Sequence, residues 1–250
     1  MATFRASASA RTLPTQAPDD RLPRVLALAA HELRTPVAVV SGYLRMLLRE
    51  QVGAITDKQR TLLAATSEAC ARIGTLIEEM NALASLEADE VNVPRDPFDL
   101  AALVSELASG VPESARRLAR IEARAPRAVM VAGDRVRLAA AVRALIDAVL
   151  RERPGPGVIV VGCSTMTDAG QTWAIVTIGD EAVTRLLVDT AGNAPSFDEW
   201  SGGLGLGLPI GRRVIAAHGG AVWSAPGGAP RAGAACRLPL APDTTRRRDG

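Results

Sequence analysis

The sequence of 250 residues has few aromatic side chains and few cysteines, and each shortage excludes a class of protein. Three phenylalanines, three tryptophans and one tyrosine are too few for a platform on which single-stranded nucleic acid could stack. The three cysteines are an odd number without a CxxC pair, so neither a disulfide framework nor a zinc site is predicted. No stretch approaches the roughly 18 consecutive apolar residues of a membrane span. We therefore expect a cytoplasmic protein with no membrane span, no nucleic-acid partner and no metal held by cysteine.

The remaining composition is that of an ordinary globular protein, with 48% hydrophobic and 22% charged residues. The 29 basic and 27 acidic residues leave a net charge of +2, so bulk charge does not select the partner. Residues 1–20 are rich in Ala, Ser and Arg, a composition that disordered tails share with transit peptides. We expect disordered tails over residues 1–20 and 241–250, and one or two domains between them.

The first ordered segment is predicted to be a long helix over residues 21–50. Its apolar side chains recur at steps of three and four residues, which is the spacing of one helical face. Pro36 lies inside this stripe and removes one helical hydrogen bond, so it should bend the helix near His31 to Thr35.

A second long helix is predicted from Thr56 to about Leu86. Thr56 and Gln59 have the spacing of a capping box, in which each residue satisfies a backbone N–H of the other. Two helices joined by a short loop form an antiparallel hairpin, and they cannot cover both of their apolar stripes alone. We therefore predict that residues 21–90 form a hairpin that pairs with a second copy into a dimeric four-helix bundle.

The two prolines between Val91 and Pro97 predict a domain boundary, and residues 97–240 then mix strands with helices. This mixture predicts an α/β sandwich, so the fold class is a helical hairpin followed by an α/β domain. The predicted elements are a strand end and helix at 98–107, strands at 120–130, a helix at 134–151, strands at 158–163 and 173–178, a loop with a helical turn at 181–201, a helix at 208–217, and a hairpin of 221–224 with 234–238. His218 ends the last helix and is interpreted as structural.

His31 and Glu32 begin the string His-Glu-Leu-Arg-Thr-Pro on the first predicted helix. An imidazole beside a carboxylate can act as a nucleophile with an adjacent base, although such a pair is more often a solvated helix pair. All six residues, His31 to Pro36, match and so resemble the phospho-accepting box of sensor histidine kinases. The resemblance implies that His31 accepts a phosphoryl group, that Glu32 acts as its base, and that Thr35 orients water in the reverse, phosphatase direction.

A glycine-rich run from Gly202 to Gly207 precedes the helix predicted at 208–217. Alternating glycines let backbone N–H groups approach a phosphate at a helix N-terminus, but such a run alone is a weak signal. The run also resembles the second glycine box of the ATP-binding domain of histidine kinases. The resemblance implies that Gly203, Gly205, Leu206 and Gly207 bind ATP.

Asp180 follows the strand predicted at 173–178 and has two interpretations. In the family that the chain resembles, an aspartate at this place accepts a hydrogen bond from the adenine amino group. The alternative is an ordinary acidic turn residue, because Ala182 and Thr184 stand where the family has glycines.

The helix predicted at 134–151 departs from the family's asparagine box. Ala144 and Ala148 stand at the two asparagine positions, the second of which ligates the Mg²⁺ that bridges the ATP phosphates in the family. A methyl group supplies no oxygen to a hard cation. Asp147 should point about 100° away from position 148 and so be a poor substitute.

The resemblance covers residues 21–240 and implies a two-component histidine kinase. Such a protein transfers phosphate from ATP to His31, with Mg²⁺ as the usual cation, and then to a response-regulator receiver domain. Because no sensor domain is evident before residue 21, a separate sensor protein is an expected partner. The alternative function is a non-catalytic adaptor that relays phosphate between response regulators through His31.

Overall fold

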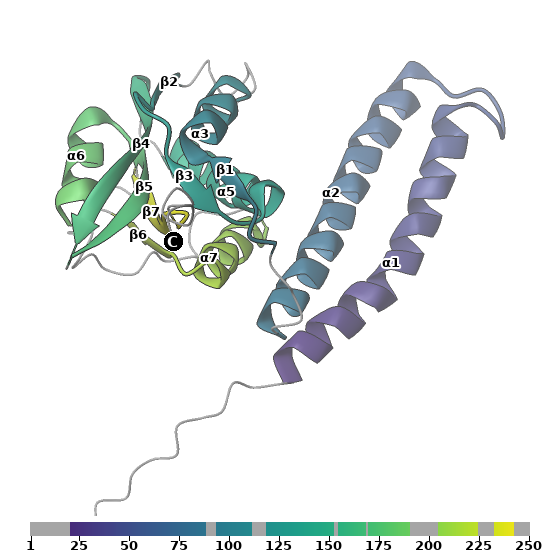
Figure 1. The fold of residues 1–250 in the computed structure, drawn as a ribbon. Coiled ribbons are helices and arrows are strands. Elements are labelled where there is room, and N and C mark those ends of the chain that lie inside the picture. The colour runs from purple at the N-terminus through teal and green to yellow at the C-terminus, as the bar shows by residue number, and fades with distance from the viewer. Residues whose placement is uncertain are drawn as a thin grey trace, which may run out of the picture.

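A computed structural model places a helical hairpin beside a mixed β-sheet that carries helices (Figure 1). The structure describes residues 21–88, 94–111, 119–152, 155–168, 170–190, 205–224 and 233–242. The predicted tail at 1–20, most of the tail at 241–250 and Gly203 lie outside the described residues.

The hairpin consists of α1 (Arg21–Leu48) and α2 (Asp57–Glu87). The predicted capping box is confirmed, because the Gln59 N–H donates to the Thr56 hydroxyl and the Thr56 N–H donates to the Gln59 side chain. Pro36 lies within α1, which changes direction in its N-terminal half (Figure 1). The two helices meet where Cys70 contacts Ser41, with 3.1 Å between the sulfur and the hydroxyl oxygen.

The hairpin of one chain leaves large apolar side chains on its surface. Tyr43 and Leu62 are each 63% exposed, although side chains of these types are usually at least half buried. The other strongly exposed members on α1 and α2 are Leu22, Val25, Leu28, Leu33, Val39, Val40, Met46, Ile73 and Leu76. One chain alone therefore does not cover the apolar stripes of α1 and α2.

Among the described residues, the sheet has five strands in the order β2-β4-β5-β7-β6, in which β2 and β4 run parallel and the other neighbours antiparallel. A separate two-stranded sheet pairs β1 with β3 in antiparallel register. The strand bounds are β1 Pro97–Asp99, β2 Arg120–Arg124, β3 Met130–Ala132, β4 Val158–Asp168, β5 Gln171–Gly179, β6 Ala221–Ser224 and β7 Ala234–Pro239. The predicted order of strands and helices is therefore present.

Helices cover both faces of the five-stranded sheet (Figure 1). On one face, α3 (Leu100–Ser109), α5 (Arg135–Glu152) and α7 (Gly207–Ala217) enclose the main core. On the other face, α6 (Glu181–Asp189) forms a smaller cluster in which the Trp223 indole donates to the Leu187 carbonyl at 3.0 Å. The prediction of only a helical turn after Asp180 was therefore wrong, because Val183 and Leu187, four residues apart, give α6 an apolar face.

His218 joins the end of α7 to the beginning of α5. Its ring is 3% exposed, and its Nε2 accepts a hydrogen bond from the Asp134 N–H at 2.9 Å. The other ring nitrogen, Nδ1, lies 2.7 Å from the Val214 carbonyl oxygen and therefore carries the proton. These two contacts confirm the structural interpretation of His218. They also hold in place the two helices that flank the cavity described below.

Candidate functional site

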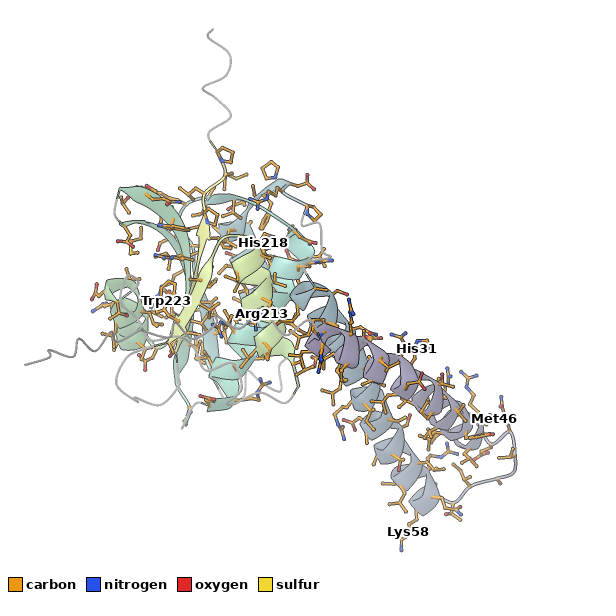
Figure 2. All side chains as sticks on the ribbon, turned by 90° about the horizontal axis from the view of Figure 1, so that it is seen from below. His31, Met46, Lys58, Arg213, His218 and Trp223 are labelled. Carbon is orange, nitrogen blue, oxygen red and sulfur yellow. The ribbon has the colours of Figure 1, made fainter. Side chains whose placement is uncertain are left out.

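The six residues of the His-Glu-Leu-Arg-Thr-Pro string are all exposed on α1. His31, Glu32 and Thr35 are all exposed, and Figure 2 shows His31 along the length of the hairpin rather than at its tip. Thr35 follows His31 by four residues and therefore lies on the same helical face one turn away. Across the described residues, no hydrogen bond or ion pair engages the side chains of these three residues. The imidazole of His31 is therefore open to a partner that approaches from solvent.

The packing of the hairpin also shows which part of α2 lies level with His31. Cys70 contacts both the Ser41 hydroxyl and the Val37 carbonyl on the antiparallel helix. Both helices rise by the same distance per residue, so moving from Val37 or Ser41 back to His31 corresponds to moving from Cys70 forward to residues 76–80. This segment of α2 includes Glu79, which reaches the second part of the site.

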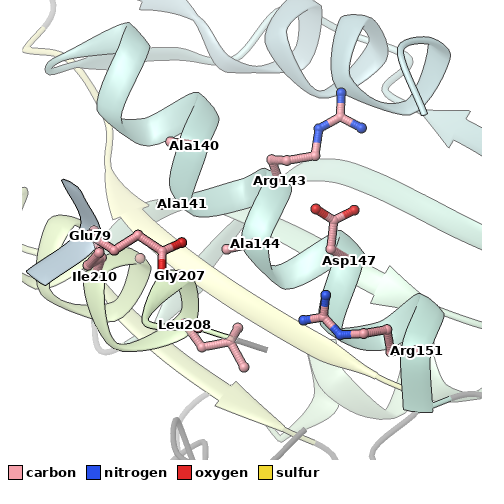
Figure 3. A pocket seen from close by; sticks show the side chains of 12 residues that line it. Glu79, Ala140, Ala141, Arg143, Ala144, Asp147, Arg151, Gly207, Leu208 and Ile210 are labelled. Carbon is pink, nitrogen blue, oxygen red and sulfur yellow. The ribbon is translucent and has the colours of Figure 1, made fainter. Parts of the chain in front are cut away.

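The second part is a cavity of about 320 Å³ between α5 and the beginning of α7 (Figure 3). Small side chains of both helices face each other across it, and arginine and aspartate side chains border it. Its lining residues are Glu79 from α2, Ala140, Ala141, Arg143, Ala144, Asp147 and Arg151 from α5, and Gly205, Gly207, Leu208, Ile210 and Gly211 around the start of α7.

The predicted residues Gly205, Leu206 and Gly207 lie together at the N-terminus of α7. Gly205 has a φ of +107°, a conformation that favours glycine. Leu206 is the N-cap residue and provides no side-chain cap. Its own backbone N–H donates to Glu79 Oε2 at 2.8 Å. A Cβ atom on Gly205 would lie 2.7 Å from the same carboxylate oxygen. The glycines on either side of Leu206 therefore let an anionic group contact the backbone directly.

Asp180 lies elsewhere, at the N-terminus of α6. Its carboxylate accepts a hydrogen bond from the Val183 N–H at 2.8 Å and so caps that helix. Among the described residues, the lining of the cavity does not include Asp180. The structure therefore gives Asp180 a capping role, and the assignment of Asp180 to the adenine amino group stays a prediction.

The two alanines of the altered asparagine box have different surroundings. Ala144 lines the cavity, whereas Ala148 is 4% exposed and belongs to the main core. Asp147 lines the cavity next to Arg143 and Arg151 (Figure 3). Burial raises the pKa of Asp147, and the charges of the two arginines oppose that rise. The expected divergence of residues 147 and 148 is present, because α5 presents residue 147 to the cavity and residue 148 to the core.

The residues of the cavity do not form a Mg²⁺ site. Ala144 carries no ligand oxygen, Ala148 lies in the core, and Asp147 is flanked by two cationic side chains that disfavour a metal ion. Within the described part of the chain, no cluster of three or more potential metal-ligating side chains is present.

Glu79, Arg143 and Arg151 are cavity residues that the sequence did not reveal. Glu79 hydrogen-bonds to a residue 127 positions further along the chain, and no local pattern predicts such a contact. The arginines had a weak signal, because Arg143, Asp147 and Arg151 are spaced by four residues and must share a helical face.

Comparisons with known proteins agree on one family. Residues 22–89 match the His Kinase A (phospho-acceptor) domain. The probable sensor histidine kinase TcrY of Mycobacterium tuberculosis is 29% identical over 85% of this chain and 45% of its own length. Sensor protein CutS of Streptomyces coelicolor is 32% identical over 81% of this chain and 49% of its own length. The chain thus spans less than half the length of these two relatives.

Solved structures show the same fold. Full-length ShkA, in a crystal structure with AMPPNP, has a TM-score of 0.61 and 24% identity over 88% of this chain and 46% of its own. The histidine kinase AdeS of Acinetobacter baumannii has a TM-score of 0.55 and 21% identity over 85% of this chain and 98% of its own.

Among the residues described here, no helix combines the length and the apolar character that crossing a bilayer requires.

Proposed function

Since the chain belongs to the two-component sensor histidine kinases, we propose that His31 accepts the γ-phosphoryl group of ATP and passes it to an aspartate of a response-regulator receiver domain. The observation that carries this proposal is the exposed His31 within a complete phospho-accepting string, on a helix that matches the phospho-acceptor domain.

The residues around His31 suit each step of this transfer. A ring nitrogen of His31 attacks the γ-phosphorus, the bond between that phosphorus and the bridging oxygen breaks, and ADP leaves with the electron pair. Glu32 takes the proton from the other ring nitrogen, which keeps the attacking nitrogen nucleophilic. The phosphoryl group then moves from His31 to a carboxylate oxygen of the receiver domain. In the reverse, phosphatase direction, Thr35 lies one turn from His31 and orients the attacking water.

The cavity between α5 and α7 is the proposed nucleotide site. The glycine-flanked backbone of residues 205–207 and the N-terminus of α7 suit a phosphate group, and Arg143 and Arg151 add positive charge. The family resemblance also assigns Gly203, which lies outside the described residues, to ATP. The adenine would contact Asp180, as the family resemblance implies. Because the residues present do not fit Mg²⁺, no step is assigned to a metal ion.

The hairpin is proposed to work as a homodimer. Its exposed apolar side chains on α1 and α2 form a surface that a second hairpin would cover in a four-helix bundle. A separate sensor protein is the proposed source of the signal.

A second function is favoured by one observation, the absence of oxygen ligands at Ala144 and Ala148. Phosphoryl transfer from ATP depends on neutralising phosphate charge, whereas transfer between His31 and a phosphorylated receiver domain does not need this cavity. A protein of this second kind relays phosphate between response regulators and makes no use of ATP.

One experiment tests both functions. The purified protein is incubated with γ-labelled ATP, and in parallel with a labelled, phosphorylated receiver domain. Label acquired from ATP supports the kinase, and label acquired only from the receiver domain supports the relay. Failure to acquire label from either donor contradicts both functions.

A further inference from the structure

We propose that Glu79 is a built-in inhibitor of the cavity between α5 and α7, whose carboxylate occupies the place of a nucleotide phosphate and must leave before ATP binds. This inference rests on the proposed nucleotide site and names how that site is regulated. The arrangement in the structure, with Glu79 of α2 against the start of α7, is then an inactive form of the protein.

The contacts of Glu79 are those expected of a bound anion. Its Oε2 accepts a hydrogen bond from the Leu206 N–H at 2.8 Å, at the end of α7 where the helix dipole is positive. The same oxygen lies where a Cβ of residue 205 would come within 2.7 Å, so a side chain at this position would push the carboxylate away from its present place. Figure 3 shows the carboxylate pointing across the start of α7 toward Ala144. Glu79 thus uses the backbone that the proposed function assigns to phosphate.

A phosphate cannot share this place with Glu79. Both groups are anionic acceptors, and the Leu206 N–H can donate well to only one of them. The described charged residues that line the cavity are Arg143, Arg151, Glu79 and Asp147, whose formal charges sum to zero. Withdrawal of Glu79 leaves a net positive lining, so the same movement exposes the backbone donor and restores attraction for an anion.

The position of Glu79 on α2 couples the cavity to the hairpin. A second contact nearby, from Arg213 Nε on α7 to Glu87 Oε1 on α2 at 2.5 Å, holds the two helices together. Release of Glu79 removes a polar contact between α2 and the start of α7 and so favours separation of the two helices. By thermodynamic linkage, ATP and hairpin docking oppose each other to the same extent. His31 lies level with residues 76–80 of α2, so this separation loosens the α/β part from the segment of the hairpin that carries the phospho-acceptor.

The test uses calorimetry to compare ATP binding by the unsubstituted protein with ATP binding by its Glu79→Ala and Glu78→Ala variants. Glu78 is the matched control, because it is the neighbouring glutamate on α2, is exposed, and does not line the cavity. The hydrogen bond between the Glu79 carboxylate and the Leu206 N–H is charge-assisted, and its loss in Glu79→Ala removes the competition with phosphate. Glu79→Ala should therefore bind ATP roughly ten- to a hundredfold more tightly. Glu78→Ala should bind ATP as tightly as the unsubstituted protein does. Glu79→Gln, which keeps the shape of the side chain without its charge, should lie between and decides the comparison if Glu79→Ala does not fold.

A second measurement follows the contact without ATP. The Leu206 amide should exchange its hydrogen more rapidly in Glu79→Ala than in Glu78→Ala, because it loses its acceptor. Equal, measurable ATP binding in all the proteins would overturn the inhibitory role and leave the nucleotide site standing. Absence of ATP binding in every protein would overturn the nucleotide site together with the inference.

Discussion

Replacement of Ala148 by asparagine tests whether the family motif or the observed helix face determines the properties of the cavity. Position 148 is where the family resemblance places a Mg²⁺-ligating asparagine, yet Ala148 is 4% exposed among core side chains. An asparagine there buries an amide without a partner, which costs about 1–3 kcal/mol, and overfills the core, which costs about 1–3 kcal/mol more. Ala148→Asn should therefore lower the free energy of unfolding by about 2–6 kcal/mol and the Tm by roughly 5–20 °C.

Ala144→Asn is the matched control on the same helix. Ala144 lines the cavity, so its asparagine can reach solvent and should cost only about 0.5 kcal/mol through helix propensity. Urea denaturation of both variants gives the difference directly, and calorimetry shows which one gains Mg²⁺-dependent ATP binding. Only Ala144→Asn should gain it. An Ala148→Asn protein of full stability that binds Mg²⁺-ATP more tightly would refute the assignment of residue 148 to the core.

Three further predictions follow from the described contacts. His218→Ala leaves the Asp134 N–H without its acceptor and should lower the free energy of unfolding by about 2–4 kcal/mol in urea denaturation, against at most about 0.5 kcal/mol for His31→Ala at an exposed position. Burial raises the pKa of Cys163 and Cys236 to about 12, so the native thiols keep protons that unfolded thiols release above about pH 8.5. Stability should therefore fall as pH rises from about 9 toward 12, and less so in a variant with alanine at both cysteines, whereas an identical pH dependence would contradict the burial effect. Sedimentation equilibrium at micromolar concentration should give twice the 26.1 kDa of one chain, and a monomer would contradict the bundle.

The hairpin was well predicted because its signals are local. The spacing of apolar residues along α1 and α2 and the pairing of Thr56 with Gln59 depend on neighbours within a turn or two. The succession of strands along the rest of the chain was likewise predicted, from β-rich runs between turn residues. What the sequence could not show was that α6 covers the second face of the sheet, because its apolar face is short and gains its partner, Trp223, from a distant strand.

The candidate site divides in the same way. His31, Glu32 and Thr35 form one contiguous string, and the structure leaves them exposed as a phospho-acceptor requires. The nucleotide side was less predictable, because the direction in which residues 147 and 148 point depends on how α5 packs. The contact of Glu79 with Leu206 depends on how the hairpin docks on α7, which no spacing within either segment encodes.

The location of the phosphoryl group tests the proposed role of His31 most directly. The chain has two histidines, His31 and the buried His218, so an acid-labile, alkali-stable label can be assigned by a single substitution. The protein and its His31→Gln variant are supplied with labelled ATP and with a labelled, phosphorylated receiver domain, and the labelled peptide is identified by mass spectrometry. We expect label on the peptide that contains His31 and none in the variant. Label that persists in His31→Gln, or that maps to another residue, would contradict the assignment of His31 as the phospho-acceptor.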